Sequence, residues 1–425
     1  MRIGFDGSCL ANRRGFGRFT REMLTALAEA PRDHELVVFV DRPSAPHVNI
    51  PANCERVVVE VGEAPTKAAS ATGRRRLGDM LAMGRAVAGA KIDLMYFPAT
   101  YSFFPIWGVK RVVVTMFDTL ALAHPDLVFP TWQGRLAWKA KEYAAAFWSD
   151  RIVTSSETSR RDLIAWFRLP ERKVALTTLG PDPLFGPREP GPVSDAALAR
   201  YGVTPGTRFL LYVGGLSPHK NLARLIEAFA QSAPSDVTLV LVGDMGDVFH
   251  THVPVLRETI ARCELGERVH FTGFVPDEDL VYFYNRAVAL VQPSLMEGFG
   301  LPPVEAMACG TPVLSSIAGS LPEVVGEAGM FFDPRDVGAI ADALRRVFDD
   351  PAERTRLARI ARRRAAEFTW AEGARRLFAC FESLAPSAAP NRRVDSAHRP
   401  GVRPEADAAD SFQGAKSTSE VASQG

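Results

Sequence analysis

The stretch EGFGLPPVE, residues 297–305, combines two glutamates with a glycine pair and two prolines. Gly298 and Gly300 leave the backbone uncovered, so its N–H groups can approach a phosphate, while Pro302 or Pro303 suits the first turn of a following helix. An anion at that place would meet free amides and the positive end of the helix. Glutamates beside a phosphate are useful when the same ligand also offers hydroxyl donors, as the sugars of a nucleotide sugar do.

The alternative interpretation is a surface turn whose glutamates are only solvated. The buried-type strand AVALVQPS, residues 287–294, leads directly into the stretch and favours a binding site. Lys220 adds to this, because it follows the strand RFLLYVG and precedes the helical pattern NLARLIEAFA. A lysine at the carboxyl end of a strand is well placed to neutralise a diphosphate, although an isolated lysine in a loop is more often solvated.

Composition describes a globular protein with room for two large domains: 425 residues, 47% hydrophobic, 23% charged and a net charge of +1. Balanced charge favours no nucleic-acid partner, and no apolar run is long enough for a bilayer. The five cysteines lack metal-ligand or C-x-x-C spacing, which indicates reduced thiols. The start, MRIGFDGSCL, is typical of a strand and turn rather than an export signal, so a cytoplasmic protein is expected.

Apolar runs alternate with helical patterns along the chain, which predicts the α/β class with doubly wound parallel sheets. Residues 1–185 form the first predicted domain, and the Pro- and Gly-rich stretch GPDPLFGPREPGP, residues 180–192, is the predicted linker. Residues 200–367 form the second domain, which ends in helices over 335–349 and 351–367. A last helix is expected within 368–385. Residues 386–425 contain almost no large apolar side chain and are expected to be disordered.

Several motifs together resemble the donor-binding half of retaining glycosyltransferases of the GT-B architecture, family 4, a group that includes bacterial mannosyltransferases. They are VGGLSPHKNLARLIEAFA, TGFVPDEDL and the long stretch from ALVQPSLMEGFGLPPVE to GMFFDP. The first half resembles the family more weakly, through RRGFGRF, FDTLALAHP and VTSSETSRRDL. The resemblance implies two Rossmann-like domains facing across a cleft, an acceptor domain followed by a donor domain, with the last helix returning to the first.

The resemblance also implies roles for particular residues. Glu305 would hold the nucleotide ribose, Glu297 would face the donor hexose, and Lys220 would neutralise the diphosphate. The backbone of the residues that follow Glu297 would line the donor: Gly298, Phe299, Gly300 and Leu301.

This chain departs from the family pattern at two positions. Gly215 stands where the family usually has an arginine that clamps the diphosphate, so either His219 supplies part of that charge or the clamp is weaker. Phe117 stands where the family typically has a histidine, directly before Asp118. Asp118 is a candidate catalytic residue at the mouth of the cleft, although an aspartate that ends a strand is as often a turn cap.

Two further glycines, Gly15 and Gly17, lie between the first strand and its helix and suit an amide-lined anion or acceptor site. The loop lacks the third glycine and the acidic residue of a dinucleotide site, which disfavours an NAD-dependent oxidoreductase.

No metal or cofactor is expected, and the nucleotide-diphosphate sugar is a co-substrate. Asp277 and Asp279 resemble a metal-binding DxD but fall where a helix begins, where acids favour the helix dipole. His250 and His252 lack a third ligand at a recognisable spacing, which favours surface or packing roles.

The expected activity is retaining transfer of a hexose, with mannose from GDP-mannose as a first guess, to a glycan or lipid-linked acceptor in cell-surface polysaccharide or glycoconjugate biosynthesis. One alternative is a nucleotide-sugar epimerase of the same architecture. The other is a donor-binding protein with a decayed site, motivated by Gly215 and Phe117.

Peripheral contact with the inner face of the membrane is left open for the first domain. Residues 71–89 and 131–148 combine basic and apolar side chains, as interfacial helices do, with Trp132, Trp138 and Trp148 as candidate anchors. Tryptophan in a helical pattern is more often part of a core.

Overall fold

The computed structural model describes residues 1–12, 15–31, 33–63, 76–245 and 252–385. Met1–Ala385 form one compact unit. The predicted disordered tail over 386–425 lies outside the described residues, as does His250. Among the helices that the structure describes, none combines the length and apolar composition needed to cross a bilayer.

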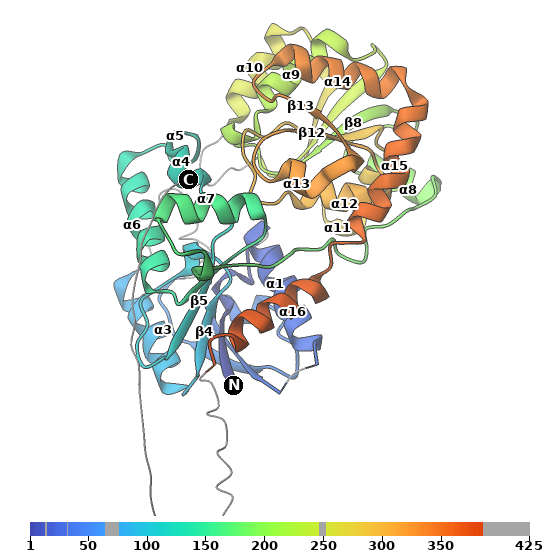
Figure 1. The fold of residues 1–425 in the computed structure, drawn as a ribbon. Coiled ribbons are helices and arrows are strands. Elements are labelled where there is room, and N and C mark those ends of the chain that lie inside the picture. Colours follow the sequence, from blue (N-terminus) through green and yellow to red (C-terminus); the bar gives the residue numbers. More distant parts are fainter. Residues whose placement is uncertain (13–14, 32, 64–75, 246–251, 386–425) are drawn as a thin grey trace, which may run out of the picture. The chain divides into compact units, whose positions relative to one another are not determined.

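The first half of the chain forms a sheet of seven parallel strands in the order β3-β2-β1-β4-β5-β6-β7. Figure 1 shows this sheet in the blue and blue-green part of the chain. Its strands are β1 Arg2–Asp6, β2 Glu35–Asp41, β3 Glu55–Val59, β4 Leu94–Phe97, β5 Arg111–Thr115, β6 Arg151–Thr154 and β7 Val174–Leu176. Its helices are α1 Gly15–Glu29, α3 Leu77–Gly89, α4 Leu120–Ala123, α5 Pro125–Val128, α6 Trp132–Trp148 and α7 Glu157–Phe167.

The second half forms a six-stranded parallel sheet in the order β10-β9-β8-β11-β12-β13. Its strands are β8 Arg208–Val213, β9 Val237–Val242, β10 Val269–Gly273, β11 Ala289–Gln292, β12 Val313–Ser316 and β13 Gly329–Phe332. Its helices are α8 Pro192–Ala199, α9 Leu222–Ser232, α10 Val253–Arg262, α11 Asp277–Arg286, α12 Leu301–Cys309, α13 Leu321–Val325, α14 Val337–Asp349 and α15 Pro351–Ala365. The α/β prediction with two doubly wound sheets is confirmed.

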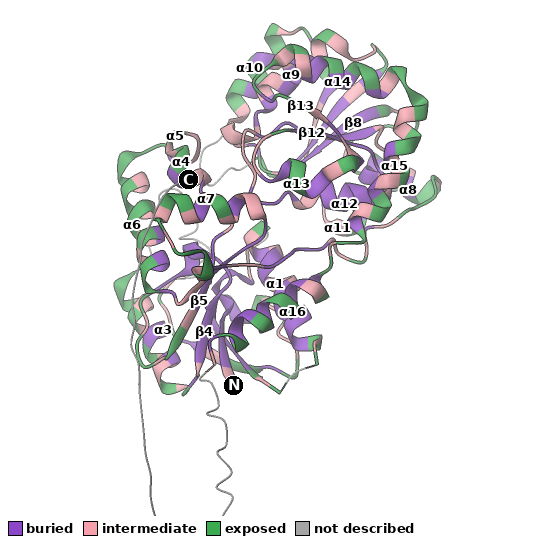
Figure 2. Ribbon diagram, viewed as in Figure 1, coloured by how far each residue is buried: buried purple, intermediate pink, exposed green. Residues whose placement is uncertain are grey.

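Both faces of each sheet are covered, which explains why the strands are apolar runs rather than alternating patterns. In β2, Leu36 and Val38 point into one core cluster while Val37 and Phe39 point into another on the opposite face. Figure 2 shows the same layering: the strands are buried and the covering helices expose their outer sides.

Two strands at sheet edges, β7 and β13, have no apolar run long enough to predict them from the sequence. β7 has three residues and β13 has four, and each lacks the long Val- and Ile-rich run of the central strands. Short strands of this kind are stabilised by pairing with a neighbour, β6 for β7 and β12 for β13, so the local sequence carries little signal for them. The short helix α8 begins at Pro192, the last residue of the predicted linker.

The last helix, α16 (Trp370–Glu382), packs against α1 of the first sheet, as Figure 1 shows in red beside blue. The rings of Phe19 and Trp370 lie 6.0 Å apart. Thr177 donates a hydrogen bond to the carbonyl of Gly373 (3.0 Å), where a side chain would collide with the backbone of Thr178. The predicted return of the last helix to the first domain is therefore observed.

Candidate functional site

The order of the second sheet reverses between β8 and β11, and the loops that follow these two strands carry Lys220 and Glu297. Ligands of doubly wound sheets bind at such a reversal, beyond the carboxyl ends of the strands. Lys220 Nζ lies 2.6 Å from Glu297 Oε1. The fold therefore brings together two residues that are 77 positions apart in the chain and that the sequence selected independently.

Glu297 is held by a cage of donors on one carboxylate oxygen. Besides Lys220, Oε1 accepts hydrogen bonds from Gln292 Nε2 (2.8 Å) and Ser294 Oγ (2.7 Å). Burial raises the pKa of Glu297, but the charge of Lys220 and these hydrogen bonds outweigh it, and the net pKa is lowered. Glu297 is therefore ionised at neutral pH and fixed in orientation.

The glycine loop (residues 297–301) joins β11 to α12. Gly300 has φ +97°, a left-handed conformation that glycine adopts without strain, and α12 begins at the next residue with prolines in its first turn. Among the described residues, no acceptor is hydrogen-bonded to the backbone N–H groups of Gly298, Phe299 or Gly300. Free amides before a helix start can bind an anion, so the geometry is suited to the phosphate cradle, which stays a prediction.

The carbonyl of Gly298 faces the first half of the chain. It accepts hydrogen bonds from three serine hydroxyls at the start of α7: Ser155 (3.4 Å), Ser156 (2.9 Å) and Ser159 (3.2 Å). A Cβ on Gly298 would lie 2.7 Å from the carbonyl oxygen of Phe117. The loop is therefore fitted between its own sheet and the loops after β5 and β6.

Asp118 lies beside this loop, and a Cβ on Gly298 would come within 2.8 Å of its Oδ2. Its other oxygen accepts the N–H of Leu120 (2.9 Å), so the turn-cap interpretation describes that half of the carboxylate. Burial raises the pKa of Asp118, and the negative charge of Glu297 raises it further. Asp118 is thus electrostatically coupled to Glu297 although the two residues belong to different sheets.

Phe117 fills the position of the missing histidine with an apolar ring. It packs against Phe16 and Phe19 at centroid distances of 5.5 and 4.9 Å. Phe16 stands between Gly15 and Gly17, and all three residues lie at the start of α1, so the expectation that the two glycines form a loop before the helix is wrong. Aromatic packing of Phe16 holds the start of this helix. Gly17 is required there, because a Cβ would overlap the carbonyl oxygen of Asn12, whereas Gly15 borders open space.

Glu305 is almost fully buried, and each of its oxygens is occupied. Arg18 of α1 donates to Oε1, and Tyr284 donates to Oε2 (2.7 Å). Arg18 also pairs with Asp277 and lies over the ring of Phe185. Burial raises the pKa of Glu305, and the charge of Arg18 counteracts the increase. Sequence reasoning missed Arg18, because no local pattern marks a contact between residues 287 positions apart.

Gly215, which stands at the position of the missing arginine, and His219, the candidate substitute for its charge, have different surroundings. Gly215 is exposed, and the nearest heavy atom to a Cβ built there is Ser217 Oγ at 3.8 Å. His219 is enclosed, and burial lowers its pKa to about 3, with Lys220 lowering it further. A neutral His219 adds no positive charge, which favours the other alternative, a weaker clamp.

The acids that resemble a metal motif are engaged by cations or a hydroxyl. They lie in the first turn of α11, as predicted. Asp277 pairs with Arg18, while Asp279 pairs with Arg200 (2.5 Å) and accepts the hydroxyl of Tyr201 (2.8 Å). His252 precedes α10. Across the described ranges, no group of three or more His, Cys, Asp or Glu residues is arranged to hold a metal ion.

Sequence reasoning also missed a buried acid on α6. Glu142 accepts the indole N–H of Trp138 (2.8 Å), while its Oε2 is buried with no partner among the described residues. Burial raises its pKa to about 8, and the charge of Asp118 adds to the increase. Trp138 also packs on Phe129 (5.5 Å), so it is not available as a membrane anchor.

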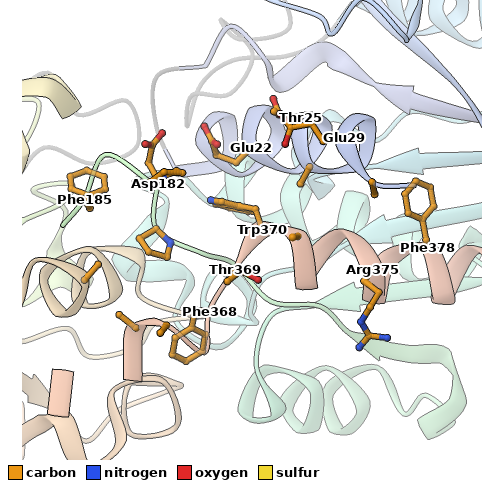
Figure 3. A pocket seen from close by; sticks show the side chains of 18 of the residues that line it. Glu22, Thr25, Glu29, Asp182, Phe185, Phe368, Thr369, Trp370, Arg375 and Phe378 are labelled. Carbon is orange, nitrogen blue, oxygen red and sulfur yellow. The ribbon is translucent and has the colours of Figure 1, made fainter. Parts of the chain in front are cut away.

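A separate cavity of about 1270 Å³ lies between α1, residues 181–187 and α16, away from Lys220 and Glu297. Figure 3 shows the carboxylates of Glu22 and Asp182 at one end, near the indole of Trp370. Burial raises the pKa of Glu22, and Asp182 raises it further.

Family models match both halves of the chain. "Glycosyltransferase Family 4" matches residues 13–183, and "Glycosyl transferases group 1" matches residues 195–364. The chain is 35% identical to the O-antigen chain mannosyltransferase B of Escherichia coli, over 62% of this chain and 68% of that protein. It is 31% identical to the D-inositol 3-phosphate glycosyltransferase of Frankia alni, over 66% of this chain and 70% of that protein.

Solved structures show the same fold. Sucrose-phosphate synthase from Thermosynechococcus elongatus has a TM-score of 0.70 at 21% identity, over 90% of this chain and 99% of that one. HepE from Anabaena, solved in complex with UDP-glucose, has a TM-score of 0.68 at 21% identity, over 90% and 100%. The two sheets are those of the GT-B architecture, and the chain belongs to glycosyltransferase family 4.

Proposed function

We propose that this protein transfers a hexose from a nucleotide-diphosphate sugar to a glycan or lipid-linked acceptor, with retention of the anomeric configuration, in cell-surface polysaccharide or glycoconjugate biosynthesis. The observation that carries the proposal is the pairing of Lys220 with Glu297 beside the free amides of the glycine loop. Mannose is the first sugar to test, because mannosyltransferases are among the relatives.

The chemistry follows from where charge develops. Departure of the nucleotide diphosphate leaves negative charge on its phosphates, which the amides of Gly298 to Gly300, the start of α12 and Lys220 would stabilise electrostatically. Glu297 is ionised and fixed by three hydrogen bonds on Oε1, so its second oxygen can accept a hydroxyl of the donor hexose. Asp118 would face the acceptor side of the same loop.

We also propose that transfer requires no metal ion. Asp277 and Asp279, whose spacing resembles a metal-binding DxD motif, pair with Arg18 and Arg200, and these ion pairs support the proposal. Activity that persists after dialysis against EDTA is the expected result. Loss of activity on chelation, with recovery on adding Mg²⁺ or Mn²⁺, would contradict it.

Peripheral membrane contact from the cytoplasm is proposed through α6. Four exposed residues lie at positions i, i+4, i+11 and i+15, which places them on one side of the helix: Trp132, Leu136, Tyr143 and Phe147. Lys139 lies over the ring of Tyr143 and adds positive charge to this side. An exposed aromatic stripe with basic residues is typical of helices that lie in an anionic lipid interface.

Liposome flotation tests the membrane proposal. The wild type is expected to float with vesicles that contain anionic lipid, and a variant with Leu136→Glu and Phe147→Glu is expected to remain in the dense fraction. Equal flotation of both proteins would contradict a role for α6.

The proposed function is tested by a thermal-shift screen against UDP-, GDP- and ADP-sugars, because a ligand that binds only the native state raises its apparent stability. The donor that binds is then offered with candidate acceptors, and the anomeric configuration of the product is read by NMR. Conversion of the donor alone would favour the epimerase. Donor binding without turnover on any acceptor would favour the decayed site.

A further inference from the structure

We propose that Arg18 is the second cation that binds the donor diphosphate, and that it rests on Glu305 and Asp277 until the donor ribose takes over Glu305. The inference rests on the proposed function, because it concerns the same donor. It assigns a binding role to a residue of the first half of the chain, near the start of α1 and directly after Gly17.

The first argument is the charge of the site. Three carboxylates lie in or beside the glycine loop and α12, those of Asp118, Glu297 and Glu305, and a fourth, that of Asp277, shares Arg18 with Glu305. Lys220 is already paired with Glu297, and His219 is neutral. A ligand with two phosphates would therefore enter a site of negative balance unless another cation is supplied. Arg18 is the described cation that contacts two of these carboxylates.

The second argument is position. Glu305 lies one turn into α12, about 6 Å along the axis from Leu301, where the helix begins and the phosphate cradle lies. The guanidinium of Arg18 is therefore one helical turn from the expected phosphates. Arginine side chains are long and bind phosphate through two parallel N–H donors, so a short rotation exchanges carboxylate partners for phosphate oxygens.

The third argument is that Arg18 occupies the position proposed for the ribose. Glu305 has an exposed fraction of 1%, and its two oxygens are taken by Arg18 and Tyr284. A ribose hydroxyl can reach Oε1 only after Arg18 leaves. The hydroxyl then replaces the guanidinium as hydrogen-bond donor, so the buried carboxylate keeps a partner throughout the exchange.

The experiment compares the wild type with Arg18→Gln by isothermal titration calorimetry. The probes are the nucleoside diphosphate, monophosphate and nucleoside of the base found among UDP, GDP and ADP. We expect Arg18→Gln to weaken diphosphate binding by at least about tenfold, as for loss of a hydrogen bond to a charged group, and to weaken nucleoside binding far less. Arg345→Gln is the matched control, because Arg345 is an exposed arginine paired with Asp342 on α14.

A rescue variant separates phosphate binding from a structural role. Gly215 is exposed and has room for a side chain. Arg18→Gln combined with Gly215→Arg therefore places a new guanidinium in the loop after β8, the loop that carries Lys220. Recovery of diphosphate affinity in this double variant supports the proposal. Equal weakening for diphosphate, monophosphate and nucleoside, with no recovery, overturns it. Failure of the wild type to bind any of the three diphosphates overturns both this inference and the proposed function.

Discussion

The ion pair of Lys220 and Glu297 neutralises two largely buried charges and fixes the positions of both side chains. Their side chains are 17% and 13% exposed, so each depends on the other for neutralisation. The sequence alone identifies only a lysine that follows one strand and a glutamate that follows another. Their contact follows from the reversal of strand order between β8 and β11, which is a property of the whole sheet.

Lys220→Met and Glu297→Gln are each expected to lower kcat by about 100-fold or more, since both remove a group that acts on developing charge. Each single change also leaves a largely buried charge unpaired, at a cost of up to about 3 kcal/mol. The double variant is expected to regain stability in urea unfolding without regaining activity. Activity near that of the wild type in either single variant would contradict the assignment.

Gly298→Ala is expected to abolish tight donor binding, because the new Cβ would lie 2.7 Å from the carbonyl oxygen of Phe117 and would push the glycine loop away. Gly215→Ala is the matched control, since its Cβ meets no heavy atom closer than 3.8 Å. Calorimetry with the nucleoside diphosphate compares the two. Equal affinities in the two variants would show that the fit of the loop is unimportant.

Helices and strands were predictable to different extents. Central strands such as β2 and β9 are buried on both faces and read as continuous apolar runs, whereas β7 and β13 are too short to carry such a pattern. Helices with strong periodicity, such as α14, begin and end within a few residues of the prediction. The Arg18–Glu305 contact had no such signal, because it joins α1 to α12 through side chains alone.

Helix α6 carries a prediction about pH. Glu142 is buried and its pKa is raised from 4.5 to about 8, so between these values the unfolded chain loses a proton that the folded protein keeps. Stability from the protonated carboxyl is thus present below pH 4.5 and is lost as the pH rises to about 8. Glu142→Gln stays neutral and can still accept the N–H of Trp138.

We therefore expect Glu142→Gln to raise the unfolding free energy at pH 8 by on the order of a few kcal/mol, and to change it little at pH 4.5. Urea unfolding at several pH values measures this difference. A stability gain that does not depend on pH would mean that the carboxyl is already ionised in the folded protein.

At the scale of the molecule, a side chain from the second half of the chain caps a helix of the first half. The carboxylate of Glu323, in α13, accepts the N–H groups of Glu157 (2.7 Å) and Thr158 (2.9 Å) at the start of α7. It acts as an N-terminal cap supplied by the other half of the chain. The contact forms beside the serines that hold Gly298, so one end of α7 is bound at two points.

Glu323→Ala is expected to speed hydrogen exchange at the amides of Glu157 and Thr158 by about fivefold, since loss of a cap costs about 1 kcal/mol. Hydrogen-exchange mass spectrometry, with and without the nucleoside diphosphate, measures the exchange rates of these amides in the variant and the wild type. Glu327→Ala is the control, because Glu327 is an exposed acid with no hydrogen bond to α7 among the described contacts. Unchanged exchange in Glu323→Ala would mean that the cap does not persist in solution.

The three serine hydroxyls on the carbonyl of Gly298 bear on attempts to build chimeras. An engineer who exchanges the first 185 residues for those of a relative, to alter acceptor choice, also exchanges Ser155, Ser156 and Ser159. Where the relative lacks these hydroxyls, the carbonyl of Gly298 in the glycine loop would lose its three hydrogen bonds. A chimera of this kind should therefore keep residues 155–159 of this chain together with its second half.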